Sequence, residues 1–284
     1  MTPSSSSTIG VFDSGFGGLT VLRALLARIP GGRFVYLGDT ARLPYGSKSQ
    51  QTVARYAVSA TRFLLDQGAD LLVIACNTAT ALALPEIQSA AAPTPVFGVV
   101  EPGATAAQRS AELSPSSGSV LVLATSATVQ SHAYLHALQA RNVAAAEQAC
   151  PLLVPLVEEG WLTTASGADP ARETVTHDVL RIYLGEALDA SPDAHTLLLG
   201  CTHYPLLRSE IAQTLAALGR PLTIIDSAEA TADAVAAHLQ AAPRAANPPT
   251  CTFYATDSVE KFQRLGPQFL GQPVPSVHLI ELPE

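Results

Sequence analysis

Short apolar segments alternate with longer segments of helical periodicity along most of the chain. Leu71–Ala75 and Thr196–Leu199 are two of these apolar segments, and a predicted helix follows each of them. Strands that are apolar on both faces are typical of parallel sheets that helices cover on both sides. The alternation therefore predicts an α/β fold, in which ligands bind beyond the carboxyl ends of the strands.

The length and the charge of the chain narrow the possible classes of protein. Its 284 residues allow for roughly two domains. A net charge of −8 disfavours nucleic acid or an anionic membrane surface as the main partner. No apolar run reaches the roughly 18 residues that span a bilayer, and the polar start MTPSSSST lacks the pattern of a signal peptide. We therefore expect a cytoplasmic protein that binds neither membrane nor nucleic acid.

The two halves of the chain repeat one arrangement at the ends of two buried strands. Cys76 follows the first strand in the sequence CNT, and Cys201 follows the second strand in the sequence CTH. An apolar predicted helix with an early proline comes after each of them. This repeat predicts two related α/β lobes that face each other across a cleft.

Four cysteines occur in the chain, widely spaced and without a CxxC pair. A lone cysteine near a buried strand is most often a small core residue, and we interpret Cys150 and Cys251 in this way. Cys76 and Cys201 occupy the strand ends where α/β folds place catalytic groups, and hydrogen-bonding side chains follow both. These two thiols are therefore the candidate functional residues.

Two thiols in one cleft allow several kinds of chemistry. A disulfide oxidoreductase would favour CxxC spacing, which is absent. A zinc site needs four ligands, whereas the two thiols and His203 supply three. His132 and His136 lie on one predicted helix, Thr128–Arg141, without the HExxH pattern of a zinc site, and we interpret them as ordinary helix residues. We therefore predict no metal.

The remaining chemistry for two opposed thiols is proton transfer at a single carbon. A thiolate removes a proton from one face while the opposite thiol delivers a proton to the other face, which inverts the carbon. A free thiol has a pKa of about 8.5, so both forms are accessible near neutral pH. Asp13 and His203 are the candidates to orient the thiols. Hydrogen-bond donors for a substrate carboxylate are expected from Ser14, Asn77, Thr78 and Thr202.

A glycine-rich segment follows the first predicted strand and precedes a helix. This segment, GFGG after Ser14, is similar to a dinucleotide-binding loop, but Thr20 stands where that loop needs glycine or alanine. Gly46–Ser49 lacks the upstream glycine of a phosphate-binding loop. We therefore predict a tight turn that presents Asp13 and Ser14 rather than a nucleotide site.

Six ordered motifs resemble the bacterial glutamate racemases, which are cofactor-independent members of the aspartate/glutamate racemase superfamily. The motifs are VFDSGFGGLTVL, YLGDTARLPYGSKS, ACNTATALAL, ATSATVQSHAY, ACPLLVPLVEEG and LLLGCTHYPLL. The match extends from about residue 9 to about residue 227. The resemblance implies that the protein interconverts L-glutamate and D-glutamate without a cofactor and supplies D-glutamate for peptidoglycan.

The resemblance also implies roles for individual residues. It implies that Cys76 and Cys201 are the two acid/base thiols. Asp13 and His203 are implied as their assistants. The positions that match substrate contacts are Ser14, Tyr45, Gly46, Asn77, Thr78, Thr125, Thr128 and Thr202. The positions that match further acidic residues of the family are Asp39 and Glu158.

The family resemblance implies a fold and an assembly as well. The expected fold class is α/β, with two pseudo-symmetric α/β domains whose largely parallel sheets face a central cleft. The first domain is expected to comprise residues 1–97 and 206–284, and the second domain residues 98–205. The expected assembly is a homodimer.

Three other functions stay open on the sequence. An aspartate racemase, or another amino-acid racemase of the same superfamily, would use the same pair of thiols. A pyridoxal-phosphate racemase would need a lysine for its Schiff base, and the chain has only Lys48 and Lys261. A non-catalytic amino-acid-binding module would also have two lobes and a cleft.

Overall fold

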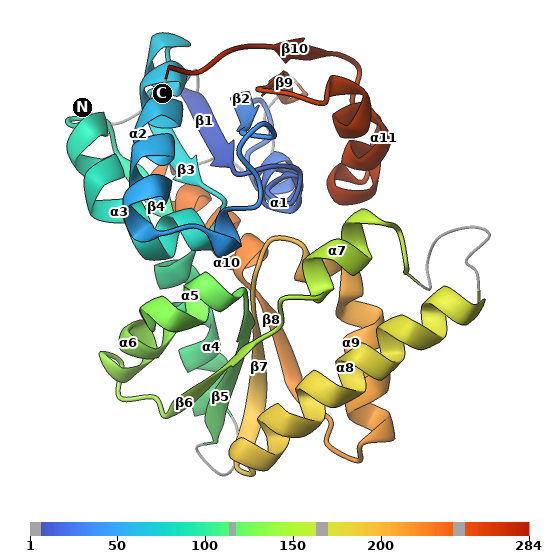
Figure 1. The fold of residues 1–284 in the computed structure, drawn as a ribbon. Helices are drawn as coiled ribbons and strands as arrows, with labels where there is room; N and C mark the ends of the chain where they lie inside the picture. The colour runs from blue at the N-terminus through green and yellow to red at the C-terminus, as the bar shows by residue number, and fades with distance from the viewer. Residues whose placement is uncertain (1–6, 114–117, 163–169, 241–247, 284) are drawn as a thin grey trace.

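The computed structural model describes residues 7–113, 118–162, 170–240 and 248–283. Figure 1 shows two sets of helices and strands stacked on each other, each with a sheet at its centre. We call the elements around the sheet of β1 the first half, and those around the sheet of β5 the second half. All strand pairings of the described residues are parallel.

The first half has a six-stranded sheet in the order β10-β9-β2-β1-β3-β4. Its strands are β1 (Thr8–Asp13), β2 (Arg33–Gly38), β3 (Leu71–Ile74), β4 (Val96–Gly98), β9 (Thr250–Ala255) and β10 (Val277–Leu279). Its helices are α1 (Leu19–Arg28), η1 (Tyr45–Ser47), α2 (Gln50–Asp66), α3 (Asn77–Ala91) and α11 (Val259–Leu270). The central strands β1 and β3 are buried along their whole length, which explains their apolar sequences.

The second half has a four-stranded sheet in the order β6-β5-β7-β8. Its strands are β5 (Ser119–Ala124), β6 (Ala145–Ala149), β7 (Ala194–Gly200) and β8 (Thr223–Asp226). The helices that surround it are α4 (Val100–Glu112), α5 (Ser126–Ser131), α6 (Ala133–Gln139), α7 (Leu153–Glu158), α8 (Pro170–Ala190), η2 (Tyr204–Leu207), α9 (Arg208–Ala217) and α10 (Ser227–His238). No helix among the described residues is long and apolar enough to cross a membrane.

The two sheets share one topology. The order β2-β1-β3-β4 in the first half has the same pattern as β6-β5-β7-β8 in the second. Cys76 comes shortly after β3, and Cys201 comes directly after β7, so the two thiols stand at equivalent strand ends. The predicted fold class, with two pseudo-symmetric α/β units, is therefore confirmed.

The course of the chain differs from the predicted division at residue 206. The strand β8 pairs with β7, with Thr196 opposite Thr223, so the second sheet extends to Asp226. The helix α9 links these parallel strands as a crossover, which keeps β8 beside β7. The predicted boundary at residue 206 therefore lies before β8, the last strand of the second sheet. The division into two domains stays a prediction.

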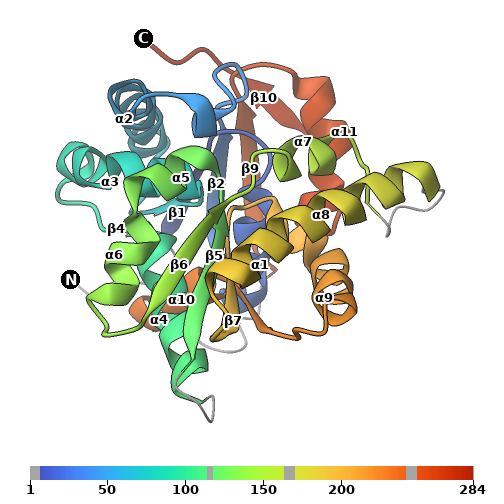
Figure 2. The same ribbon diagram turned by 60° about the horizontal axis from the view of Figure 1, so that its bottom comes forward.

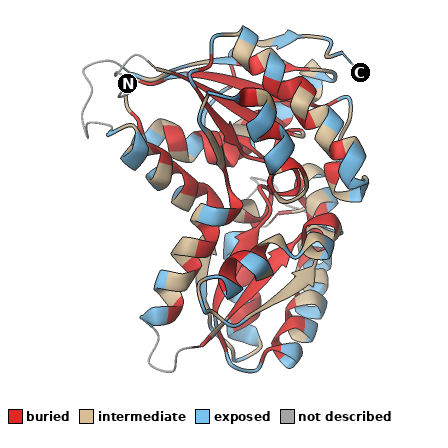
Figure 3. Ribbon diagram, turned by 90° about the vertical axis from the view of Figure 1, so that its left-hand side faces the viewer, coloured by how far each residue is buried: buried red, intermediate tan, exposed pale blue. Residues whose placement is uncertain are grey.

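One buried apolar cluster continues from the first half into the second. It contains Phe16 and Leu19 of the first half together with Leu121, Leu153 and Leu197 of the second. Figure 3 shows buried strands at the centre of each half and exposed positions on the outer faces of the helices. Because the apolar interior is shared, the ends of the two sheets are held close to each other.

Two local predictions differ from the structure. The predicted helix Thr128–Arg141 is divided into α5 and α6, because His132 has a left-handed backbone with a φ of 54°. His132 is thus not an ordinary helix residue, and its Nδ1 lies 2.9 Å from Oε2 of Glu147. The strand β6 was not predicted, because its sequence AAEQA lacks an apolar run. The predicted surface connection 241–250 lies mostly outside the described residues.

Candidate active site

A cavity of about 520 Å³ lies between the two halves, at the carboxyl ends of both sheets. In Figures 1 and 2, α5 and α7 lie at the end of the second sheet that faces the first half. The residues predicted from the sequence that line this cavity are Ser14, Tyr45, Gly46, Cys76, Asn77, Thr78, Thr125, Glu158, Cys201, Thr202 and His203. The structure therefore brings most of the predicted residues to one cavity.

Three predicted residues lie behind the wall of the cavity rather than on it. Asp13 is 1% exposed and accepts a hydrogen bond from the Gly15 N–H. Asp39 is fully buried and accepts a hydrogen bond of 2.6 Å from the Tyr45 hydroxyl. Thr128 is fully buried and its hydroxyl contacts the hydroxyls of neighbouring threonines, so its contact with substrate stays a prediction.

Cys76 joins the end of β3 to the start of α3. The Ala79 N–H donates a hydrogen bond of 3.4 Å to its Sγ, and its thiol donates to the Ser14 hydroxyl at 3.5 Å. Burial and the charge of Asp13 raise the Cys76 pKa to about 12, although these two hydrogen bonds act in the opposite direction. The neutral thiol is therefore the resting form of Cys76.

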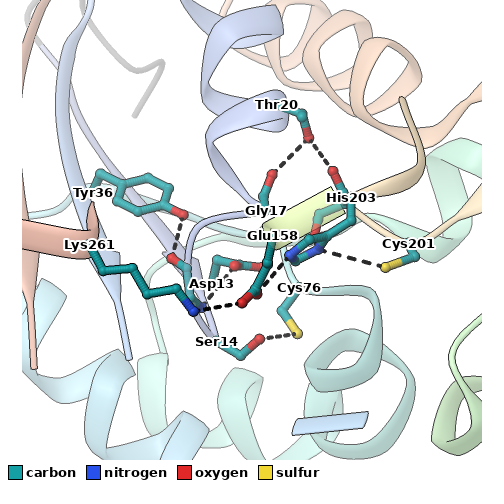
Figure 4. A network of polar contacts seen from close by, with 12 residues as sticks. Asp13, Ser14, Gly17, Thr20, Tyr36, Cys76, Glu158, Cys201, His203 and Lys261 are labelled. Atoms are coloured by element: carbon teal, nitrogen blue, oxygen red, sulfur yellow. Dashed lines mark hydrogen bonds and ion pairs between the residues drawn. The ribbon is translucent and has the colours of Figure 1, made fainter. Parts of the chain in front are cut away.

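Cys201 has a different neighbour, the imidazole of His203. Its Sγ lies 4.0 Å from His203 Nδ1, and His203 Nε2 lies 3.2 Å from Glu158 Oε1 (Figure 4). Burial alone would lower the His203 pKa, but the contacts with Cys201 and Glu158 raise it to about 10. An imidazolium next to a sulfur stabilises the thiolate.

The Glu158 carboxylate has partners at both oxygens. Its Oε1 faces His203, and its Oε2 accepts a hydrogen bond of 2.9 Å from the Lys261 ammonium. Burial raises the Glu158 pKa, but His203 and Lys261 together outweigh burial and lower it to about 2. Glu158 is therefore a carboxylate across the whole neutral range.

The glycine-rich turn after β1 packs directly against the loop of Cys201. A Cβ on Gly17 would lie 2.2 Å from Thr202 Oγ1 and 2.5 Å from His203 Nδ1, which leaves room for glycine alone. The Thr20 hydroxyl donates a hydrogen bond of 3.0 Å to the carbonyl oxygen of Thr202. One side of the turn thus donates its Gly15 N–H to the buried Asp13, and its other side contacts the second half.

Tyr134 is a site residue that the sequence did not single out. Its hydroxyl accepts a hydrogen bond of 2.7 Å from Asn77 Nδ2 and reaches across from α6 to α3. Asn77 Oδ1 is buried without a hydrogen-bond partner among the described residues. Tyr134 belongs to the motif ATSATVQSHAY, which was a signal for it. Further cavity residues that were not predicted include Lys48, Gln130 and Glu159.

The described residues contain no group of three or more His, Cys, Asp or Glu side chains placed to hold a metal ion. The chemistry that the arrangement supports is proton transfer, because two thiols from equivalent strand ends line one cavity. Hydroxyl and amide groups around them are suited to hold a carboxylate.

Comparisons with known proteins agree on one family. The profile of the family described as Asp/Glu/Hydantoin racemase matches residues 19–235. A glutamate racemase of Koribacter versatilis is 48% identical over 299 aligned residues, which cover 96% of this chain and 97% of that protein.

Solved structures of this family are also similar to the chain. The glutamate racemase from Thermus thermophilus in complex with beta-chloro-D-alanine has a TM-score of 0.82 at 40% identity and covers 99% of both chains. The glutamate racemase from Francisella tularensis in complex with D-glutamate has a TM-score of 0.83 at 30% identity and covers 98% of both chains. The chain therefore belongs to the Asp/Glu/Hydantoin racemase family.

Proposed function

We propose that the protein is a glutamate racemase that inverts Cα of glutamate by moving a proton between Cys76 and Cys201. The observation that carries this proposal is the position of both thiols, at equivalent strand ends, on one cavity. The D-glutamate bound to the Francisella tularensis relative supports glutamate as the substrate. The family resemblance implies that the product D-glutamate is used for peptidoglycan.

In the proposed reaction, one cysteine is a thiolate and the other is a thiol. The thiolate takes the proton from Cα and becomes a thiol, and the electron pair of the broken C–H bond stays on the substrate. The opposite thiol then gives its proton to the other face of Cα and becomes a thiolate. The reverse direction uses the same two groups with their roles exchanged.

The two thiols have different charged neighbours before substrate binds. Burial and Asp13 keep Cys76 protonated, whereas the imidazolium of His203 stands next to Cys201. A glutamate whose Cα–H faces Cys76 therefore reacts only after the Cys76 thiol has lost its proton.

The carbanion that forms at Cα needs hydrogen-bond donors at the substrate carboxylate. Ser14, Thr78 and Thr202 line the cavity and carry hydroxyl groups. Asn77 lies at the start of α3, where backbone N–H groups have no partner within the helix. These local donors offset the net charge of −8, which by itself repels a dicarboxylate.

The protein's location and assembly follow from the family resemblance alone. We propose a cytoplasmic protein, because peptidoglycan precursors are built there, and a homodimer. Sedimentation at micromolar concentration tests the assembly, and a monomer at all concentrations would contradict it.

The test is incubation of L-glutamate with the purified protein in deuterated water, without added cofactor. We expect the optical rotation to decay to zero and the product to carry deuterium at Cα. Parallel incubation with L-aspartate tests the alternative aspartate racemase. Binding of glutamate without inversion would favour an amino-acid-binding module, and a visible absorption band of bound pyridoxal phosphate would favour the lysine-dependent racemase.

A further inference from the structure

Lys261 stands at the far end of a line of polar contacts that begins at Cys201. Its Nζ lies 2.9 Å from Glu158 Oε2. The other oxygen of that carboxylate, Oε1, lies 3.2 Å from His203 Nε2, and His203 Nδ1 lies 4.0 Å from Cys201 Sγ. Figure 4 shows the four side chains in this order.

We infer that Lys261 is a positioning residue, which holds the Glu158 carboxylate in the orientation that faces His203. Lys261 does not line the cavity, so it acts through Glu158 and not on the substrate. The inference rests on the proposed function, because the oriented imidazole serves the Cys201 thiol in proton transfer.

The contact between Lys261 and Glu158 joins the two halves of the molecule. Lys261 lies on α11 of the first half, and Glu158 is the last residue of α7 in the second half. The two residues are 103 positions apart in the sequence, and α11 and α7 lie side by side in Figures 1 and 2. The C-terminal helix thus reaches the acid/base group of the opposite half.

The ammonium of Lys261 is itself held in place by an aromatic ring. It lies 5.3 Å from the ring centroid of Phe16, within the range of a cation–π interaction. Phe16 is fully buried and packs edge-on against Phe262, at 5.6 Å between ring centroids. The ring cluster therefore fixes the point from which Lys261 donates to Glu158.

The orientation of Glu158 matters because this residue also lines the cavity. A carboxylate held only by His203 would be free to turn toward the cavity, where it would repel the carboxylates of the substrate. Contacts at both oxygens prevent this rotation. The Lys261 side chain is 33% exposed, so we expect the pair to affect catalysis more than folding.

The surroundings of His203 allow orientation to be distinguished from simple charge. His203 faces Asp13 at the end of β1, Cys201 on its own loop and Glu158 on α7, and the ring of Phe269 on α11 packs against it. Glu158 is one of the groups that raise the His203 pKa. If the loss of Lys261 frees Glu158 to turn away, His203 loses a carboxylate contact and its pKa falls. If Lys261 acted only as a nearby positive charge, its loss would instead raise the His203 pKa.

The first test is NMR titration of His203 in Lys261→Met, which needs no catalytic activity. We expect the His203 pKa to fall in this variant. The matched control is Arg264→Met, which removes the same charge from an exposed position of α11 and leaves the His203 pKa unchanged. An unchanged or raised His203 pKa in Lys261→Met would overturn the inference, even if the protein proves not to racemise glutamate.

The second test is kinetic and compares four variants. We expect Lys261→Met to lower kcat/KM for glutamate about tenfold, the size of one lost charged hydrogen bond, and Lys261→Arg to restore most of it. If Lys261 acts through Glu158, the double variant with Glu158→Gln is no slower than Glu158→Gln alone. Independent, multiplicative losses would contradict the inference. Absence of racemisation in the unmodified protein would contradict the proposed function instead.

Discussion

The two thiols stand at equivalent places in two similar sheets, yet their surroundings differ. Cys76 contacts the Ser14 hydroxyl and the Ala79 N–H, with the buried Asp13 nearby. Cys201 contacts His203, which continues to Glu158 and Lys261. Burial and Asp13 favour the neutral thiol at the first position, whereas the second thiol has an imidazole with a raised pKa beside it.

This difference shows that the positions of the two sulfurs and the charges around them have separate origins. Equivalent strand ends place both sulfurs at one cavity, because the order of strands is the same in both halves. The charge near each sulfur depends on side chains that have no counterpart in the other half. Each half also supports the other, since Gly17 packs on the loop of Cys201 and Tyr134 holds Asn77 beside Cys76.

The largest expected effect comes from removing either sulfur. We expect Cys76→Ala and Cys201→Ala each to lower the rate of racemisation at least about a thousandfold, because each removes one acid/base group. In deuterated water, each variant should still exchange the Cα proton of one enantiomer, and the two variants should select opposite enantiomers. Chiral chromatography with mass spectrometry measures both quantities.

The control for these variants is Cys251→Ala, whose sulfur lies on β9 and does not line the cavity. It should retain the activity of the unmodified protein. If Cys76→Ala and Cys201→Ala both exchange the proton of the same enantiomer, or if either variant keeps full activity, the two thiols do not act from opposite faces of Cα.

The next effect tests the contact between the two halves. In Gly17→Ala, the new methyl group would overlap Thr202 and His203, so we expect kcat/KM to fall about a hundredfold. Gly15→Ala is the matched control in the same turn, because its methyl group would meet only the flexible end of Leu43 at 3.3 Å. Equal losses in the two variants would show that the turn does not position the loop of Cys201.

A smaller effect is expected on the side of Cys76. Tyr134→Phe removes the nearer of the two acceptors of the Asn77 amide, and we expect kcat/KM to fall about tenfold from the loss of one buried hydrogen bond. Tyr254→Phe serves as the control, because its hydroxyl contacts Gln67 away from the cavity. Steady-state kinetics with both enantiomers checks the expectation, and an unchanged Tyr134→Phe variant would refute the role of this residue.

The smallest effects concern stability, and they begin with two residues of the second half whose pKa values are shifted in opposite directions. The His203 pKa is raised from 6.5 to about 10, so its contribution is complete below pH 6.5 and is lost as the pH rises through about 10. The Glu158 pKa is lowered from 4.5 to about 2, so its contribution is complete above pH 4.5 and is lost as the pH falls through about 2. Both contributions are complete only between pH 4.5 and pH 6.5.

We therefore expect Glu158→Gln to lower the free energy of unfolding most within that window, by about 1.5 kcal/mol. Asp13→Asn should do the reverse at neutral pH, because burial raises the Asp13 pKa and its charged form is costly. Chemical denaturation across the pH range measures both, with the exposed Glu159→Gln as control. The same sign of change in both variants would contradict the difference between the halves.

Much of the fold was predictable because its signals are local. Runs such as Leu71–Ile74 are apolar since both faces of the strand are covered, and that pattern is visible without any partner. Elements with weak local signals were missed, such as the half-exposed edge strand β6 and the break at His132. The position of β8 was also missed, because pairing with β7 depends on how the chain crosses over.

The sequence by itself determined the strand ends at which the two thiols stand and the family to which the motifs point. Tertiary structure alone decided that Thr128 and Asp39 lie behind the cavity wall, that Tyr134 holds Asn77, and that Lys261 reaches Glu158. The physical reason is the separation in sequence between the residues that encode each feature. A strand end is encoded by adjacent residues, whereas the charge beside a sulfur depends on side chains that folding brings together from distant parts of the chain.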